Sequence, residues 1–89
     1  MKAIVSVIGR DRVGICAAVC TKMADYGINI LDITQTIVQG NFTMVMAVDL
    51  EGATKTFGEI SGGLTELGEG MGLSIRIQRQ EIFDAMHTI

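Results

Sequence analysis

The sequence predicts an α+β fold whose elements follow the order β-α-β-β-α-β. Two stretches carry apolar residues at helical spacing, and each lies between segments with the alternation or β-branched composition of strands. A turn signal, Gln39-Gly40-Asn41, separates the two middle strands and predicts a hairpin. Two of the four strand segments are largely apolar on both faces, which is typical of the centre of a sheet. With 89 residues, the chain has room for one domain.

The first strand is predicted over residues 3–8, where one face is wholly apolar. Gly9 ends this strand, and a helix follows. Asp11 is a candidate N-cap, because its side-chain oxygen is placed to accept a hydrogen bond from the backbone two or three residues later. Gly27 is the expected stop of the helix. The apolar stripe of this helix consists of Ile15, Ala18, Val19, Lys22, Met23 and Tyr26.

The second strand is predicted over residues 28–38, because apolar and polar residues alternate there. Its buried face is expected to hold Leu31, Ile33 and Ile37. The return strand of the hairpin covers residues 42–50, and both of its faces are largely apolar.

A second helix is predicted from about Thr54 to Gly68, with a bend near Gly62-Gly63 because glycine is a poor helix former. Its apolar stripe consists of Phe57, Ile60, Leu64, Leu67 and Met71. The last strand alternates Leu73, Ile75 and Ile77 with Ser74, Arg76 and Gln78, so one of its faces is expected to be wet.

This order predicts a ferredoxin-like fold over residues 1–80, with both helices on one face of a four-stranded antiparallel sheet and the first and third strands in its centre. A short amphipathic helix is predicted over residues 81–89. The other face of the sheet is left without a helix and carries apolar residues at its centre, namely Ile4, Ile8, Val45 and Ala47. We expect the C-terminal helix to cover that face or to lie in a dimer interface.

Composition excludes several partners. The net charge is -3 and no basic run exists, so neither nucleic acid nor an anionic membrane surface is an expected partner. The longest unbroken apolar stretch, residues 44–48, is far shorter than a membrane span. With no signal-peptide pattern at the start, we expect a cytoplasmic protein with reduced thiols. The 48% hydrophobic content is high for so small a chain and favours self-association.

Cys16 and Cys20 lie four residues apart, on the same side of the predicted first helix. Small core residues are the favoured interpretation. A two-thiolate metal site is the alternative, but a closed site needs about four ligands and the single histidine, His87, lies near the other end of the chain. Met44 and Met46 are interpreted as core or interface rather than soft-metal ligands. We therefore expect neither a metal nor a cofactor.

No catalytic constellation is evident in the sequence. The chain has one histidine, no recognisable Ser/His/Asp arrangement and no glycine-rich phosphate loop after a parallel strand. We therefore do not expect an enzyme.

Two stretches carry a resemblance to a known family. They are Asp11-Arg12-Val13-Gly14-Ile15, which follows the strand ending at Gly9, and Gly27-Ile28-Asn29-Ile30, which follows the helix. With the predicted element order, they make the chain similar to the ACT domain, a small regulatory module that binds amino acids. The likeness extends over residues 1–89, and the whole chain resembles bacterial and archaeal proteins that consist of a single ACT domain.

The resemblance implies a ligand site between two subunits. In amino-acid-binding ACT domains, the ligand touches the turn after the first strand and the start of the second strand across the interface. By position, this implicates Gly9, Asp11, Gly14, Asn29 and Asp32. A helix N-terminus attracts a carboxylate, a side-chain amide both donates and accepts, and an acidic residue pairs with an ammonium group. Some ligand-binding members have an amide in place of Asp11 and a side chain in place of Gly9.

Each of these residues also has a structural interpretation. Asp11 is an N-cap candidate, and Gly14 is more often needed for packing than for ligand approach. Asn29 follows a helix stop, where a turn role is common. Asp32 is a solvated residue on a wet strand face, or one that blunts an edge strand.

The sequence therefore favours a non-enzymatic regulatory module that binds an amino acid or similar metabolite as a homodimer or higher assembly, and that acts on a regulated protein partner. In such an assembly, the edge strand starting at Asn29 pairs with its mate across a two-fold axis. The alternative is a ligand-free domain for protein interaction or oligomerisation. A more remote alternative is a thiol metal-binding protein that uses Cys16 and Cys20.

Overall fold

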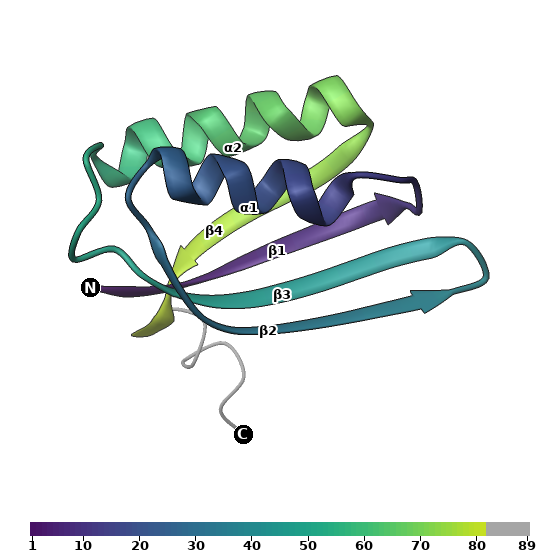
Figure 1. Ribbon diagram of the computed structural model, residues 1–89, viewed down its shortest axis with the longest axis horizontal. Coiled ribbons are helices and arrows are strands. Elements are labelled where there is room, and N and C mark those ends of the chain that lie inside the picture. The colour runs from purple at the N-terminus through teal and green to yellow at the C-terminus, as the bar shows by residue number, and fades with distance from the viewer. Residues whose placement is uncertain (82–89) are drawn as a thin grey trace.

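The computed structural model describes residues 1–81 and confirms the predicted element order. The elements are β1 (Lys2–Arg10), α1 (Ile15–Asp25), β2 (Asn29–Val38), β3 (Asn41–Asp49), α2 (Phe57–Met71) and β4 (Leu73–Arg79). The strands form one antiparallel sheet in the order β2-β3-β1-β4, and both helices cover the same face (Figure 1). This is the ferredoxin-like fold with β1 and β3 in the centre. Except for residue 81, the helix predicted over residues 81–89 lies outside the described residues.

The core lies between the helices and the covered face of the sheet. Every second residue of β1, β3 and β4 points into it, as alternation in a strand requires. Met44 and Met46 are fully buried there, so the prediction that they are core residues is confirmed. From the helices, the buried hydrophobic residues are Ile15, Val19, Met23, Ile60 and Leu64. No helix within residues 1–81 is long and apolar enough to cross a membrane.

The prediction that Asp11 is the N-cap of the first helix is wrong. α1 begins at Ile15, and its N-cap is Gly14, which has φ 90° and ψ 1°. Glycine adopts this left-handed conformation without the steric cost that a Cβ brings, so the start of the helix is fixed by the backbone and not by a side-chain acceptor. Asp11 lies three residues earlier, where its backbone N–H donates to the Gly40 carbonyl over 2.8 Å.

α2 begins at Phe57, three residues later than the sequence predicted. Its N-cap is Thr56, whose side-chain oxygen accepts from the Glu59 N–H over 3.2 Å, while Glu59 Oε1 accepts from the Thr56 N–H over 3.2 Å. This reciprocal capping box satisfies two N–H groups that the first turn leaves free. The helix then continues without interruption past Gly62-Gly63 to Met71.

β2 is the edge strand, and its predicted burial is wrong. Ile33 and Ile37 point to the helix side of the sheet but stay 40% and 56% exposed, because α1 barely contacts β2, whereas α2 packs along the other edge strand, β4. A bulge at Leu31 shifts the register between Ile30 and Asp32, so Ile30 joins the helix side of the strand. The hairpin prediction is confirmed. Its two-residue turn has positive φ at both central positions, as a type I′ turn requires.

Candidate functional site

The turn after β1, residues 11–14, is exposed, and hydrogen bonds hold its first two residues. On one side, the Asp11 N–H is bonded to Gly40 in the β2–β3 hairpin. On the other side, Arg12 Nη1 donates to the Met71 carbonyl at the end of α2 over 3.4 Å. The turn is therefore positioned against the end of the sheet where edge strand β2 finishes.

The N-terminus of α1 is free to receive an anion. Its N-cap has no side chain, and its first turn holds no acidic residue. No side chain caps the first N–H groups of the helix, and the Ala18 N–H donates to the Gly14 carbonyl over 2.9 Å. Free N–H groups at a helix N-terminus carry a partial positive charge that favours a carboxylate or phosphate.

Gly14 is glycine for its conformation and not for packing. A Cβ on Gly14 would meet no atom within 4 Å, so the space above the helix N-terminus is open. Gly9 differs, because a Cβ there would come within 2.5 Å of Leu73 Cδ2 and 3.2 Å of the Gly72 carbonyl oxygen. The packing interpretation therefore accounts for Gly9, while Gly14 leaves room for a ligand.

Asn29 and Asp32 lie far from the turn in the same chain. Asn29 pairs with Asp49, which in turn pairs with Lys2 at the start of β1. The turn follows Arg10 at the other end of that strand, roughly 26 Å away at about 3.3 Å per residue. Asp32 is exposed, and its Oδ1 accepts from the Ile33 N–H over 2.8 Å. One chain therefore does not bring the two predicted halves of the site together.

Val13 is a surface residue that the sequence analysis missed. Its side chain is 98% exposed in the turn, directly before Gly14. A fully exposed branched apolar side chain beside an uncapped helix N-terminus offers a contact for an apolar group of a ligand or for a neighbouring chain. In the sequence, the feature that pointed to it was a single apolar residue between Arg12 and Gly14.

Cys16 and Cys20 are not core residues, so the favoured interpretation was wrong. Cys16 is exposed and Cys20 is half-buried, because each follows a buried residue of the α1 stripe and falls on its flank. Their Sγ atoms are 3.9 Å apart. Burial raises the pKa of the Cys20 thiol, and the hydrogen bond and charge of Cys16 raise it further. No group of three metal-ligating side chains occurs within residues 1–81.

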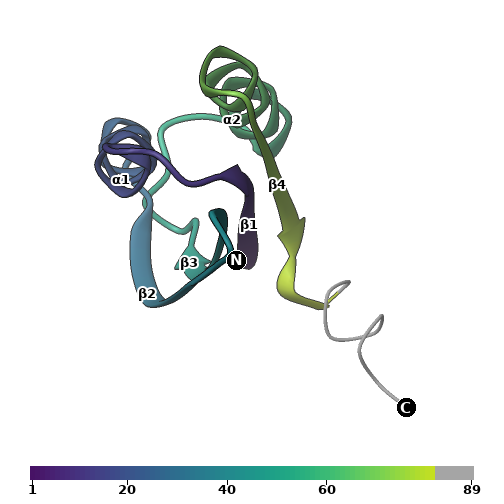
Figure 2. The same ribbon diagram turned by 90° about the vertical axis from the view of Figure 1, so that its right-hand side faces the viewer.

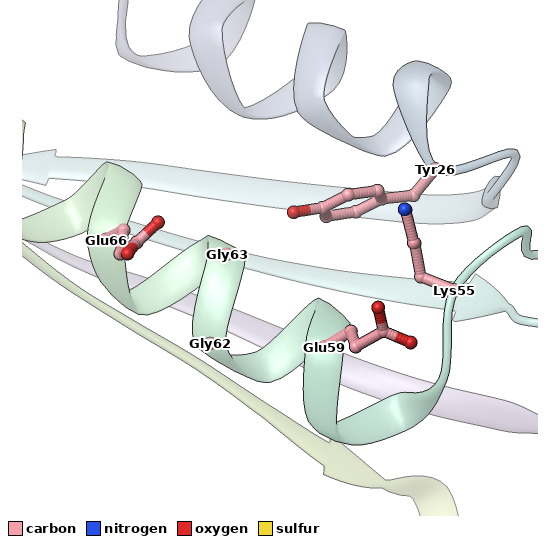
Figure 3. A pocket seen from close by; sticks show the side chains of 6 residues that line it. All are labelled: Tyr26, Lys55, Glu59, Gly62, Gly63 and Glu66. Carbon is pink, nitrogen blue, oxygen red and sulfur yellow. The ribbon is translucent and has the colours of Figure 1, made fainter.

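A hollow lies at the other end of α1 (Figure 3). Tyr26 reaches over α2 towards Gly63, and Lys55, Glu59 and Glu66 surround the opening. The Lys22 ammonium stands 5.2 Å from the centre of the Tyr26 ring. This hollow contains none of the predicted site residues, and its lining mixes both signs of charge.

Comparison with known proteins adds to this geometry. The family model of the ACT domain matches residues 2–78. This range includes both helices and the whole sheet except its last residue. The chain belongs to the ACT domain family. An ACT domain is a regulatory module that binds a small ligand, and the sequence-based resemblance is confirmed.

Two relatives of this ACT domain match it over nearly their whole length. A UPF0237 protein from Bifidobacterium longum is 51% identical, with 99% of this chain and 98% of that protein covered. A UPF0237 protein from Listeria innocua is 49% identical, with 100% of both covered. Among solved structures, an ACT domain protein from Streptococcus pneumoniae is 37% identical, with a TM-score of 0.82 and 93% of each chain covered.

Proposed function

We propose that this ACT domain is a non-enzymatic cytoplasmic module that binds an amino acid or a similar small metabolite between two copies of the chain. The observation that carries the proposal is the uncapped N-terminus of α1 beside the unpaired edge of β2. One copy supplies the helix N-terminus, and the other supplies the start of its second strand. The ligand then biases how the copies pack, or how they engage a regulated protein.

Strand geometry supports this two-chain site. Two β2 strands of ten residues each, paired antiparallel over their full length, place Asn29 of one copy opposite Val38 of the other. Val38 is two residues from Gly40, whose carbonyl holds the backbone of Asp11. The pairing therefore brings Asn29 to the end of the sheet where the turn of the other copy lies. It also covers exposed apolar side chains of β2.

The side chains give each half of an amino acid a partner. The free N–H groups at the start of α1 suit the carboxylate, with close approach over Gly14. The Asn29 amide both donates and accepts, and Asp32 pairs with the ammonium group. Asp11 is the first residue of the same turn, where its carboxylate favours the ammonium end of the ligand over the carboxylate end.

Calorimetry and thermal shift against the twenty amino acids test this function. We expect heat and a higher Tm with at least one of them, because a ligand that binds only the folded state stabilises it. Ala17→Glu places a carboxylate at the third helical position, where it stabilises the helix and competes for the free N–H groups. We expect this variant and Asn29→Ala each to weaken binding at least tenfold.

Thr21→Glu is the matched control, since it adds the same charge at an exposed position farther along α1. It should bind as the unmodified chain does. If none of the twenty amino acids gives heat or a thermal shift, the amino-acid proposal is overturned.

The second candidate is an interaction or oligomerisation domain without a metabolite. The observation that favours it is the exposed apolar surface of Val13, Ile33 and Ile37. It predicts strong self-association, which Asn29→Ala should change. Neither the unmodified chain nor this variant should respond to a ligand. Sedimentation velocity with and without the amino-acid mixture separates the two candidates.

A further inference from the structure

The sheet face opposite the helices is apolar at its centre, and no element within residues 1–81 covers it (Figure 2). Its middle consists of the β1–β3 pairs Ile4–Ala47, Ser6–Val45 and Ile8–Thr43. Ile8 is 53% exposed and Val45 36%. We call this surface the open face. An apolar sheet centre in water is unfavourable, so it needs a cover.

The described part of the chain ends beside the open face, at Glu81. The chain leaves β4 at Arg79, and residues 80–81 lie next to Met1 and Lys2 on the side of the sheet away from the helices (Figure 2). Lys2 is the first residue of β1, two residues before Ile4 of the open face. The last described residue therefore lies at the edge of the uncovered surface.

The sequence of this segment fits the open face. Its apolar residues have the spacing of one side of a helix: Ile82, Phe83, Met86 and Ile89. Eight helical residues span about 12 Å at 1.5 Å each. The distance along β1 from Ile4 to Ile8 is about 13 Å at 3.3 Å per residue. The charges of the open face are mixed, with Lys2 and Arg76 beside Asp32 and Asp49, so the fit depends on the apolar residues.

The start of the segment argues against a return to its own sheet. Gln80 and Glu81 are already helical, directly after Arg79. A strand that reverses into a helix packed on the same sheet usually needs a loop of two to six residues, and none is present here. The described chain thus has no loop after Arg79 in which to reverse onto its own sheet, and this favours the sheet of a second copy.

We propose that residues 82–89 of one copy lie on the open face of a second copy, in a reciprocal exchange about a two-fold axis. Each copy then buries its own apolar centre under the segment of the other. The surface involved is a sheet face and not the β2 edge, so this exchange is independent of the proposed ligand site.

Disulfide trapping between two different chains tests the exchange. Both chains carry Cys16→Ser and Cys20→Ser. One also carries Ser6→Cys at the centre of the open face, and the other carries Ala85→Cys in the segment. After mixing and mild oxidation, we expect a disulfide-linked heterodimer by intact mass. Ala47→Cys in place of Ser6→Cys should give the same product, while Thr65→Cys, exposed on α2, should give none.

Two outcomes would overturn the proposal. One is the absence of a heterodimer with both Ser6→Cys and Ala47→Cys. The other is an internal disulfide in a single chain that carries Ser6→Cys and Ala85→Cys, because the segment would then cover its own sheet. Circular dichroism of each variant confirms that it is folded.

A second measurement needs no introduced cysteine. Phe83→Ala should raise the dissociation constant of self-association at least tenfold, because it removes the largest apolar side chain of the segment. Thr88→Ala, off the apolar side, should stay within twofold of the unmodified chain. Equal constants for the two variants in sedimentation equilibrium would contradict the proposal.

Discussion

Individual glycines of α2 have different reasons to be glycine. A Cβ on Gly62 would meet nothing within 4 Å, whereas one on Gly68 would come within 2.6 Å of the Leu73 carbonyl oxygen and 3.2 Å of Ile75 Cγ1. Gly68 is buried where the helix presses on β4. Both positions have the same low helix propensity, so only the neighbours distinguish them.

We therefore predict opposite signs for two alanine substitutions. Gly62→Ala should raise the free energy of unfolding by about 1 kcal/mol, the helix preference of alanine over glycine. Gly68→Ala should lower it by roughly 1–3 kcal/mol, because the backbone of β4 has to move to admit the methyl group. Urea unfolding followed by circular dichroism measures both, and stabilisation by Gly68→Ala would show that the close contact is relieved easily.

At the scale of an element, the capping box of α2 links stability to pH. The Thr56 N–H and the Thr56 hydroxyl both donate to the Glu59 carboxylate. These bonds, the N–H bond most, hold the pKa of Glu59 below its usual value. A carboxylate with a lowered folded-state pKa stabilises the fold fully above its unfolded pKa, about 4.3. That contribution is lost as the pH falls through the lowered value.

Glu59→Gln should therefore flatten the acid side of the stability profile. Glutamine keeps an acceptor for the Thr56 N–H but does not titrate. The free energy of unfolding of the variant should therefore approach that of the unmodified chain as the pH falls below about 4.3. Thr56→Ala should cost about 1 kcal/mol at pH 7 through loss of the cap. Glu66→Gln, an exposed position on the same helix, is the control, and a profile parallel to that of Glu59→Gln would contradict the assignment.

At the scale of the whole molecule, the two-chain site predicts complementation between two inactive variants. Ala17→Glu disables the helix N-terminus of its own chain, and Asn29→Ala disables the strand of its own chain. In a mixed dimer, one site receives both defects and the other receives none. Half of randomly formed dimers are mixed, so about one quarter of the sites should bind after exchange of subunits.

Calorimetric stoichiometry before and after mixing measures this recovery. Each variant alone should bind at no site, and a mixture that recovers nothing would place both groups in the same chain. Co-purification through two different affinity tags confirms that mixed dimers formed.

The sequence by itself determined the elements and their order. Alternation in β1 and β4 and the stripes of both helices specify which side chains face the core, since burial follows local periodicity. The hairpin at Gln39-Gly40 was equally readable, because its positive φ angles suit few residues. The family was evident from the turn and the Gly-Ile-Asn-Ile stretch.

Tertiary structure decided what local patterns leave open. Asp11 has the chemistry of an N-cap, but the left-handed Gly14 starts the helix three residues later. Cys16 and Cys20 have core-like composition, yet they lie on the flank of α1. Ile33 and Ile37 alternate as buried residues do, but α1 barely contacts their strand, so they stay exposed. Whether these side chains are buried, and what they contact, depends on the packing of helices and strands. Their neighbours in the fold are distant in the sequence, so local patterns do not specify them.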